Sequence, residues 1–175
     1  NGGSDGSLAG ISLQGPSRIV GERTVTVTGK TVPATSGIAV DVYVKARAES
    51  KQRVLTAADG SYRAQVKIGE NSSLRAVAAG IGSQTVTVTV DSKVRISVRK
   101  RRGSSLVNGV VRPALPGRVL LLRVGGVTPV ARTTARNGRF QIKPKSITTH
   151  GRFEAVFIPF GNRAERSTSN KGTIR

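Results

Sequence analysis

The main pattern along the chain is strict alternation of apolar and polar residues. Val25 and Val27 alternate with threonines in RTVTVTG, and the same period of two continues in IAVDVYVK, SYRAQVKI, QTVTVTV and KVRISVR. Alternation with β-branched residues predicts strands that bury one face and expose the other. The inward positions expected from it are Val40, Val42, Val44, Tyr62, Ala64, Val66, Ile68, Val86, Val88, Val90, Val94, Ile96 and Val98. No window keeps helical spacing, so the sequence predicts an all-β fold.

The pattern is written twice. GKTVPATSGIAVDVYV matches NGVVRPALPGRVLLLRV, SLRAVAA matches RFEAVFI, and SQTVTVTV is aligned with the weaker STSNKGTIR. Pro33 then corresponds to Pro113, and Gly60 to Gly138. Two units of roughly eighty residues follow. We expect a Gly-rich N-terminal segment at 1–10, a first domain at 11–91 and a second at 92–175, joined at the polar break Asp91-Ser92-Lys93.

Each unit contains one strong turn signal. Asp59-Gly60 and Asn137-Gly138 both stand between alternating runs and are followed by an aromatic residue, Tyr62 or Phe140. Such pairs are typical of type I′ hairpins, because both central residues need a positive φ. The sequence therefore predicts one hairpin in each unit, with its aromatic side chain pointing into the core.

The order of these motifs resembles a known family. Gly-Lys-x-x-Pro-Ala, Gly-x-x-Val-x-Val-x-Val, Thr-x-Ala-Asp-Gly-Ser-Tyr and Leu-Arg-Ala-Val-Ala-Ala-Gly follow one another as in the bacterial Ig-like repeats of secreted and surface proteins, particularly those of actinobacteria. The Ala-Asp-Gly-Ser-Tyr element also resembles the regulatory-like β-sandwich modules of carboxypeptidases. The resemblance implies two Ig-like antiparallel β-sandwiches in tandem, a secreted or cell-surface location, and no catalytic residue.

Charge and composition restrict the classes of binding partner and site that the chain can have. The 175 residues have a formal net charge of +20 and a pI of about 11.8, which favours attraction to polyanions such as nucleic acid, acidic wall polymers or anionic lipid. The absence of Cys excludes disulfides and thiolate metal sites. No apolar run reaches the roughly twenty residues of a transmembrane helix. We expect that any signal peptide was removed before Asn1.

The ionisable residues do not indicate a reaction centre. The nine carboxylates show no spacing typical of an acid–base pair, so we expect no enzyme. A lone His150 in a polar loop does not make a metal site, and Asn1, Asp5, Asp59 and Asp91 do not cluster as calcium ligands, so neither metal nor cofactor is expected. Some bacterial Ig-like modules contain Lys–Asn or Lys–Asp cross-links beside a buried acid. Alternation places Phe153, Ala155 and Phe157 inward and Glu154 outward, which disfavours such a cross-link at Glu154.

One basic cluster is a candidate binding site. It consists of Arg95, Arg99, Lys100, Arg101 and Arg102, at the first turn expected in the second unit. Two interpretations remain open: a solvated turn, or a patch that contacts polyanions. Charge is added to the same half by Arg112, Arg118, Arg123, Arg132, Arg136 and Arg139. Because the chain has few aromatic residues for base stacking and no predicted helix for the major groove, sequence-specific nucleic-acid binding is not expected.

Several functions fit these features. The first is a rigid structural or adhesive spacer on the cell surface, with other copies of the chain or neighbouring surface proteins as partners. In its filament form, the strand at Ser167–Arg175, whose apolar content is limited to Ile174, leaves a sheet edge that another chain completes. The second is a basic envelope module that binds acidic cell-wall glycan. The third is an accessory region of a larger secreted hydrolase.

Overall fold

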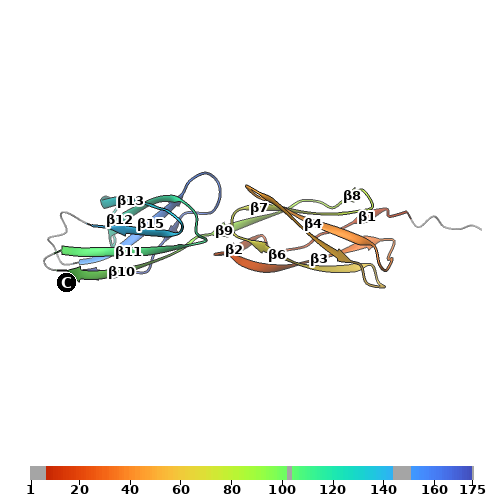
Figure 1. The fold of residues 1–175 in the computed structure, drawn as a ribbon, viewed down its shortest axis with the longest axis horizontal. Coiled ribbons are helices and arrows are strands. Elements are labelled where there is room, and N and C mark those ends of the chain that lie inside the picture. Colours follow the sequence, from red (N-terminus) through yellow and green to blue (C-terminus); the bar gives the residue numbers. More distant parts are fainter. Residues whose placement is uncertain (1–6, 102–103, 144–150, 175) are drawn as a thin grey trace, which may run out of the picture. The chain divides into compact units, whose positions relative to one another are not determined.

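The protein consists of two all-β units. A computed structural model describes residues 7–101, 104–143 and 151–174, and these residues form strands and turns without a helix (Figure 1). Unit 1 comprises Asn1–Ile19 and Arg23–Thr89, and unit 2 comprises Val20–Glu22 and Val90–Arg175. The predicted all-β class is confirmed, and no helix long and apolar enough to cross a membrane occurs among the described residues.

Unit 1 is a sandwich of two sheets. One sheet has the strand order β1-β3-β6, and the other has the order β2-β9-β7-β4-β5, with β8 paired to β7. Its strands are β1 (Gly10–Ile11), β2 (Arg18–Val20), β3 (Arg23–Val32), β4 (Ala39–Lys45), β5 (Glu49–Leu55), β6 (Ser61–Ile68), β7 (Ser72–Ala78), β8 (Ile81–Gly82) and β9 (Val86–Asp91). Leu8 is buried and the Ala9 amide donates to the Val32 carbonyl, so residues assigned from sequence to the N-terminal segment already belong to this sandwich.

Unit 2 repeats this architecture. One sheet has the order β10-β11-β14, and the other has the order β13-β12-β15, with β16 and β17 both paired to β15. Its strands are β10 (Lys93–Arg101), β11 (Ser104–Arg112), β12 (Gly117–Arg123), β13 (Pro129–Ala135), β14 (Arg139–Ile142), β15 (Gly151–Pro159), β16 (Ser167–Thr168) and β17 (Gly172–Ile174). The register matches strand for strand: Gly29 pairs with Tyr62 in unit 1, and Gly109 pairs with Phe140 in unit 2.

The cores follow the alternation in the sequence. Val40, Val42 and Val44 in β4 are buried, as are Tyr62, Ala64, Val66 and Ile68 in β6. In unit 2, Phe153, Ala155 and Phe157 are fully buried, while Glu154 between them is partly exposed. The predicted inward positions are confirmed here, as is the outward placement of Glu154. Two of the thirteen predicted positions, Val86 and Val98, are only half-buried.

The predicted hairpins are wrong as pairings of the flanking strands, although at Asn137-Gly138 the two-residue turn forms and is closed by backbone bonds in both directions between Arg136 and Arg139. Asp59-Gly60 joins β5 to β6, and Asn137-Gly138 joins β13 to β14, but in each case the two strands belong to different sheets. Gly60 has φ of 71° while Asp59 does not reach positive φ, whereas Asn137 (49°) and Gly138 (68°) both do. The local turn chemistry was therefore right for Asn137-Gly138. It does not determine the partner of the next strand, because β6 and β14 obtain more pairing from β3 and β11.

The repeated motif is explained by packing around these connections. A Cβ on Gly60 would lie 2.8 Å from Ala34 Cα, and one on Gly138 would lie 2.9 Å from Ala114 Cα. Each turn glycine thus rests against the Pro-Ala segment that follows β3 or β11. The Gly60 carbonyl accepts the Thr31 amide at 3.0 Å, and the Gly138 carbonyl accepts the Val111 amide at 2.8 Å. Since the residues that recur in both units make these contacts, they specify architecture.

The segment at the C-terminal end of unit 2 covers the edge of β15, and its own outer edge has no further strand among the described residues. β15 pairs with β16 at Phe157↔Ser167 and with β17 at Phe153↔Gly172. Between them, the Ser169 amide donates to the Ala155 carbonyl and the Ser169 Oγ accepts the Ala155 amide, both at 2.8 Å. Side-chain and backbone groups together therefore satisfy this edge of β15.

The same serine contact shows which residues of the two units correspond in the sequence alignment. In unit 1 the Ser83 amide donates to the Ala76 carbonyl at 2.8 Å and the Ser83 Oγ accepts the Ala76 amide at 3.0 Å. Ser83 therefore corresponds to Ser169, not to Ser167 as the sequence alignment had it. The alignment therefore shifts by two residues, and Gly172 corresponds to Val86. Val86 pairs with Leu74 in unit 1, and Gly172 pairs with Phe153 in unit 2.

Candidate functional site

The outer face of the sheet β10-β11-β14 in unit 2 gathers exposed cationic side chains. On these strands the buried residues, such as Ile96, Val107 and Phe140, point inward, so the alternate positions form the outer face. We call this surface the cationic face, and its six exposed cations are Lys93, Arg95, Arg99, Arg112, Arg139 and Lys143. The three strands contain neither Asp nor Glu.

Strand register arranges these cations in rows across the sheet. Lys93 is opposite Arg112, and Arg95 is opposite Val110, which is itself opposite Arg139. Arg99 lies further along β10, and Lys143 directly follows β14. Successive outward residues on one strand are about 6.7 Å apart, and neighbouring strands about 4.8 Å apart. From the row of Lys93 to that of Arg99, the cationic face thus extends roughly 20 Å along the strands.

A neutral polar row separates the cationic rows. Ser97, Asn108 and Gln141 are opposite one another in the register, and Gln141 Nε2 donates to Asn108 Oδ1 at 3.0 Å. This hydrogen bond orients both amides and leaves further donor and acceptor capacity on each. The surface is a shallow hollow of about 750 Å³ whose lining includes Arg95, Arg139 and both amide side chains. It can therefore hold negative charge and, beside it, hydroxyl groups.

The charge of the chain is concentrated in the second domain. Residues 92–175 hold 19 of the 29 Lys and Arg residues but two of the nine Asp and Glu residues, which leaves a formal net charge of +17 there and +3 on residues 1–91. None of the six cations of the cationic face has an ion-pair partner in the part of the chain that the structure describes. Their positive field is therefore not compensated locally.

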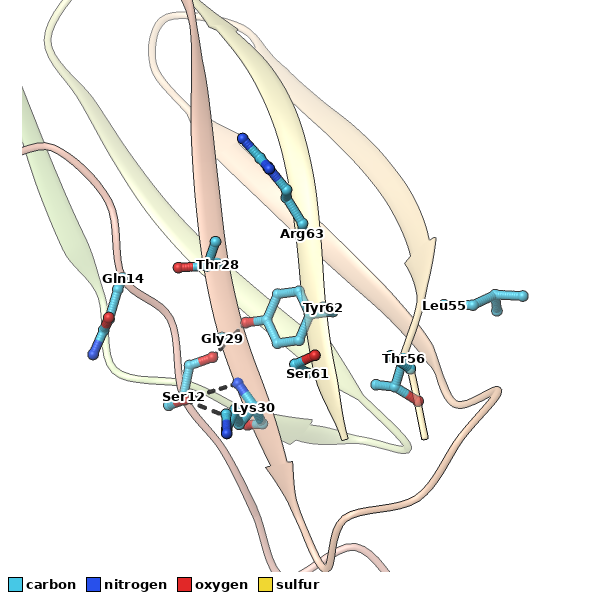
Figure 2. A pocket seen from close by; sticks show the side chains of 11 residues that line it. Ser12, Gln14, Thr28, Gly29, Lys30, Leu55, Thr56, Ser61, Tyr62 and Arg63 are labelled. Atoms are coloured by element: carbon cyan, nitrogen blue, oxygen red, sulfur yellow. Dashed lines mark hydrogen bonds between the residues drawn. The ribbon is translucent and has the colours of Figure 1, made fainter. Parts of the chain in front are cut away.

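The equivalent surface in unit 1 carries its charge at different positions. Its hollow, of about 630 Å³, is lined by Ser12, Thr28, Lys30 and Arg63, and the Tyr62 ring runs from β6 toward Gly29 (Figure 2). Ser12 stands where unit 2 has Arg95, and Ser61 where unit 2 has Arg139. Burial raises the pKa of Tyr62 to about 12, and its hydroxyl donates to the Ser12 carbonyl, so this phenol has a structural role.

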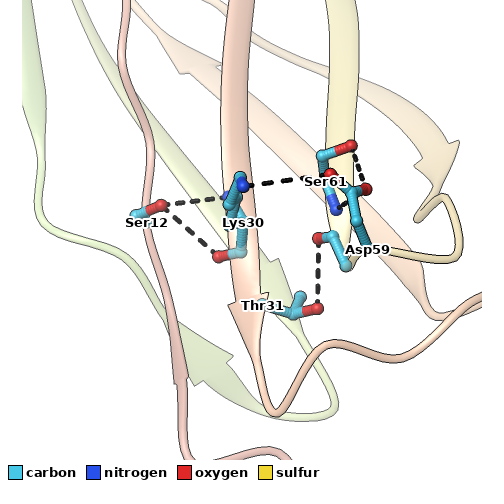
Figure 3. Close-up of polar contacts among 6 residues, drawn as sticks. Ser12, Lys30, Thr31, Asp59 and Ser61 are labelled. Carbon is cyan, nitrogen blue, oxygen red and sulfur yellow. Dashed lines mark hydrogen bonds and ion pairs between the residues drawn. The ribbon is translucent and has the colours of Figure 1, made fainter.

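Acidic side chains in unit 1 are engaged with neighbours. Lys30 Nζ lies 3.8 Å from Asp59 Oδ2, and the Ser61 amide donates to Asp59 Oδ1 at 3.0 Å (Figure 3). Hydrogen bonds from Ser61, aided by Lys30, hold the pKa of Asp59 below its usual value. On the other sheet, the Arg53 guanidinium donates to both oxygens of Asp41 at 2.7 and 2.8 Å and lowers the pKa of Asp41 to about 2.

These carboxylates offer no acid–base pair. Asp41 and Asp59 both have lowered pKa values, which suits ion pairing and does not suit proton donation near neutral pH. No group of three or more potential metal-ligating side chains occurs among residues 7–101, 104–143 and 151–174.

The predicted cluster is only partly described. Arg95 and Arg99 are exposed on the outer face of β10. The strand continues through Lys100 and Arg101, so these two belong to a strand and not to the expected turn. Arg102 and His150 lie outside the described residues. The polyanion-binding role of the cluster stays a prediction.

The rest of the cationic face was not predicted from the sequence. Arg112 and Arg139 were assigned to the same half without a position on a face, and Lys93, Lys143 and the row of Ser97, Asn108 and Gln141 were not included in the predicted site. The alternation in KVRISVR already assigns Lys93, Arg95 and Arg99 to one face. The neighbours of that face come from β11 and β14, and their register depends on pairings between distant segments.

Comparisons with known proteins define the class as tandem Ig-like or fibronectin type III-like sandwiches. No protein-family model matches the chain, and no curated protein matches it in sequence. It is similar to a tetra-tandem repeat from the extending region of a large adhesion protein, with 16% identity, a TM-score of 0.50 and 95% of this chain covered. The match spans 49% of that chain, so the present chain corresponds to about half its length.

A second similar structure is a segment of two fibronectin type III domains from chicken tenascin. The identity is 14%, the TM-score is 0.52, and the match covers 93% of this chain and 98% of that one. At this level of identity the likeness establishes the fold, and the prediction of two Ig-like antiparallel sandwiches in tandem is confirmed.

Proposed function

We propose that this chain is a non-enzymatic, extracellular structural module: a tandem of Ig-like sandwiches that acts as a spacer in a secreted or surface protein of the actinobacterial type. The resemblance of its motifs to bacterial Ig-like repeats supports this location. So does the fold that it shares with the repeats of a large adhesion protein and with the tenascin segment.

The observation that carries the proposal is the structural role of the repeated motif. Three features recur in both units. They are the glycine that packs against an aromatic ring, the Pro-Ala segment that contacts the turn glycine, and the serine whose hydroxyl accepts a backbone amide of β7 or β15. Residues that recur thus maintain the sandwich. The outer surfaces, in contrast, differ between the units, as expected when a common scaffold presents a surface suited to each domain.

Surface location is tested on intact cells of the organism that encodes the chain. We expect an epitope placed before Gly10 to be removed by an added protease and labelled by antibody without permeabilisation. A cytosolic protein carrying the same epitope is the control. Protection of the epitope in intact cells, with loss only after lysis, would refute the extracellular assignment.

The filament and hydrolase alternatives have less support. Strand addition directly to β15 is disfavoured because β16, Ser169 and β17 already occupy its edge. Copies of a chain with net charge +20 also repel one another at low salt. Association with a secreted hydrolase is decided by the sequence that flanks these residues in the full gene product.

A second function, binding of a polyanion in the cell envelope, is favoured by the cationic face. Its cations are exposed and have no acidic neighbour on their own three strands. The direct test is co-sedimentation of the chain with purified cell walls. We expect retention at low salt and release at high salt, because such contacts are screened by ions. Failure to sediment at low salt would remove this function.

A further inference from the structure

We propose that the ligand of the cationic face is a linear acidic polysaccharide that lies along the direction of β10 and β11. This inference rests on the proposed polyanion binding and specifies the ligand class. Carboxylates of the polymer pair with Arg95, Arg99, Arg112 and Arg139, and sugar hydroxyls contact the amides of Asn108 and Gln141.

Charged and neutral polar rows alternate along the cationic face. Along β10 the outward residues are Lys93, Arg95, Ser97 and Arg99, so two cationic rows, one neutral row and another cationic row follow in order. A polymer whose groups are all anionic would place an anionic group over the row of Ser97, Asn108 and Gln141. A polysaccharide that carries both carboxylates and hydroxyl groups can place carboxylates over the cationic rows and hydroxyls over the neutral row.

The amide side chains of this face have hydrogen-bonding capacity left for a ligand. The bond from Gln141 Nε2 to Asn108 Oδ1 uses one donor and one acceptor, which leaves the Asn108 amide donors and the Gln141 carbonyl oxygen for a ligand. A hydroxyl group both donates and accepts, so it can satisfy the two together. Polymers without hydroxyl groups, such as polyphosphate, cannot donate to the Gln141 carbonyl oxygen.

The described residues of the cationic face present no aromatic stacking surface. The aromatic residue of this sheet, Phe140, is 6% exposed because its ring packs inward against Gly109. The apolar side chains that the cationic face presents are aliphatic: Val110, which is 40% exposed and stands between Arg95 and Arg139, and the half-buried Leu106 opposite Arg99. Single-stranded nucleic acids depend on aromatic stacking for much of their affinity, so this face suits them less well.

The test measures binding of four probes to the intact chain at low ionic strength: a polygalacturonate oligomer, inorganic polyphosphate, single-stranded DNA and neutral dextran. We expect polygalacturonate to bind most tightly and dextran not to bind. Tighter binding of DNA or of polyphosphate than of polygalacturonate, at matched chain charge, would overturn the assignment to an acidic polysaccharide.

The position of the site is tested with paired charge removals. Arg95→Gln with Arg139→Gln removes two cations from the cationic face. Arg118→Gln with Arg132→Gln removes two exposed cations from the other sheet of the same unit and is the matched control. We expect polygalacturonate affinity to fall roughly tenfold in the first variant and less than about twofold in the control, because exposed ion pairs act locally. Equal losses would show that net charge alone drives binding.

The hydroxyl contacts are tested with Asn108→Ala and Gln141→Ala together, a change that leaves the charge intact. We expect about a threefold to tenfold loss for polygalacturonate and no change for polyphosphate, since only the sugar uses the amides. An unchanged polygalacturonate affinity would overturn the polysaccharide class. Because cell-wall sedimentation is measured separately, a chain that sediments with walls but fails here retains envelope binding and loses only the proposed ligand.

Discussion

The first strands of the two units differ in length, and other differences follow from this. β1 spans only Gly10–Ile11, whereas β10 spans Lys93–Arg101. The longer strand covers the end of its own sandwich: a Cβ on Gly172 would lie 2.9 Å from Val98 Cγ2 and 3.3 Å from Ile96 Cδ1. Unit 1 has Val86 at the corresponding position. The last strand of unit 2 is therefore poor in apolar residues because β10 supplies them.

On the outer surface, an arginine of unit 2 lacks the acidic partner that the equivalent arginine has in unit 1. In unit 1, Asp41 of β4 is opposite Arg53 of β5, and in unit 2, Leu120 of β12 is opposite Arg132 of β13. The arginine is thus present in both units, but its carboxylate partner is replaced by leucine. On the other sheet, Arg95 and Arg139 stand in place of Ser12 and Ser61, whereas Val110 and Gln141 stand in place of Lys30 and Arg63. The same scaffold becomes strongly cationic through changes at outward positions that leave the core intact.

The two units can be followed separately in the intact chain. Both tyrosines, Tyr43 and Tyr62, lie in unit 1, and all four phenylalanines lie in unit 2. Tyrosine fluorescence therefore reports on unit 1, and phenylalanine ring signals in NMR report on unit 2. Changes at the glycine, serine and amide positions are therefore paired, with one in each unit, and for Asp41→Asn the unchanged unit 2 is the internal reference.

The largest effect is expected at the central glycines. Gly29→Ala and Gly109→Ala should each destabilise their own unit by about 3 kcal/mol in urea unfolding, because the new methyl group overpacks the sandwich. At Gly109 the three atoms nearest the new methyl all belong to the Phe140 ring, whereas at Gly29 the nearest is the Ser12 carbonyl oxygen, followed by atoms of Tyr62.

A double-mutant cycle separates these two causes. Phe140→Leu should rescue part of the loss in Gly109→Ala, whereas Tyr62→Leu should rescue little in Gly29→Ala, since the Ser12 backbone remains in place. Equal rescue in the two units would show that the first strand does not restrict Gly29.

The next effect concerns the serine that both units share. Ser83→Ala and Ser169→Ala each remove the hydroxyl that accepts an amide of the neighbouring strand, Ala76 or Ala155. We expect losses of about 1–3 kcal/mol, because the amide is left without its partner. The loss should be larger for Ser83, which is buried, than for Ser169, which is half-buried. Thr85→Ala, at an exposed position two residues after Ser83, is the control and should change stability little.

How far the sequence could predict these features depends on whether they are local. Alternation alone identified the buried valines of β4 and the inward Tyr62 and Phe140. It could not show that β5 and β6 lie in different sheets, because that depends on the pairing of β6 with β3. The correspondence of Ser83 with Ser169 was missed for a related reason: the weak apolar pattern of Ser167–Arg175 makes sense only with β10 beside it.

A smaller effect tests whether the long β10 is held by a side chain specific to unit 2. Asn170 Oδ1 accepts the Ile96 amide at 2.8 Å, and Asn170 Nδ2 donates to the Ile96 carbonyl at 3.1 Å. Asn170→Ala should cost unit 2 about 1 kcal/mol, with faster hydrogen exchange at the Ile96 amide. Gln84, the equivalent residue in unit 1, has an exposed side chain, and Gln84→Ala should change stability by less than about 0.5 kcal/mol. Similar losses for both variants would contradict the assigned role of Asn170.

The smallest effect is an acid-dependent one confined to unit 1. Asp41 has a pKa of about 2 in the folded state, below its ordinary value of 3.8, chiefly because of the hydrogen bond from Arg53. A lowered folded-state pKa stabilises the fold above the unfolded value, and this stabilisation disappears as the pH falls from about 4 through about 2. Tyrosine fluorescence should show a decline in unit 1 stability over this range that is steeper in the wild type than in Asp41→Asn. The effect should be small, because Arg53 is largely exposed and the pair is screened by water and salt. Unit 2, which has Leu120 at this position, should show the same acid dependence in both proteins, and a change in its phenylalanine signals would mean that the substitution acts beyond the Asp41–Arg53 pair.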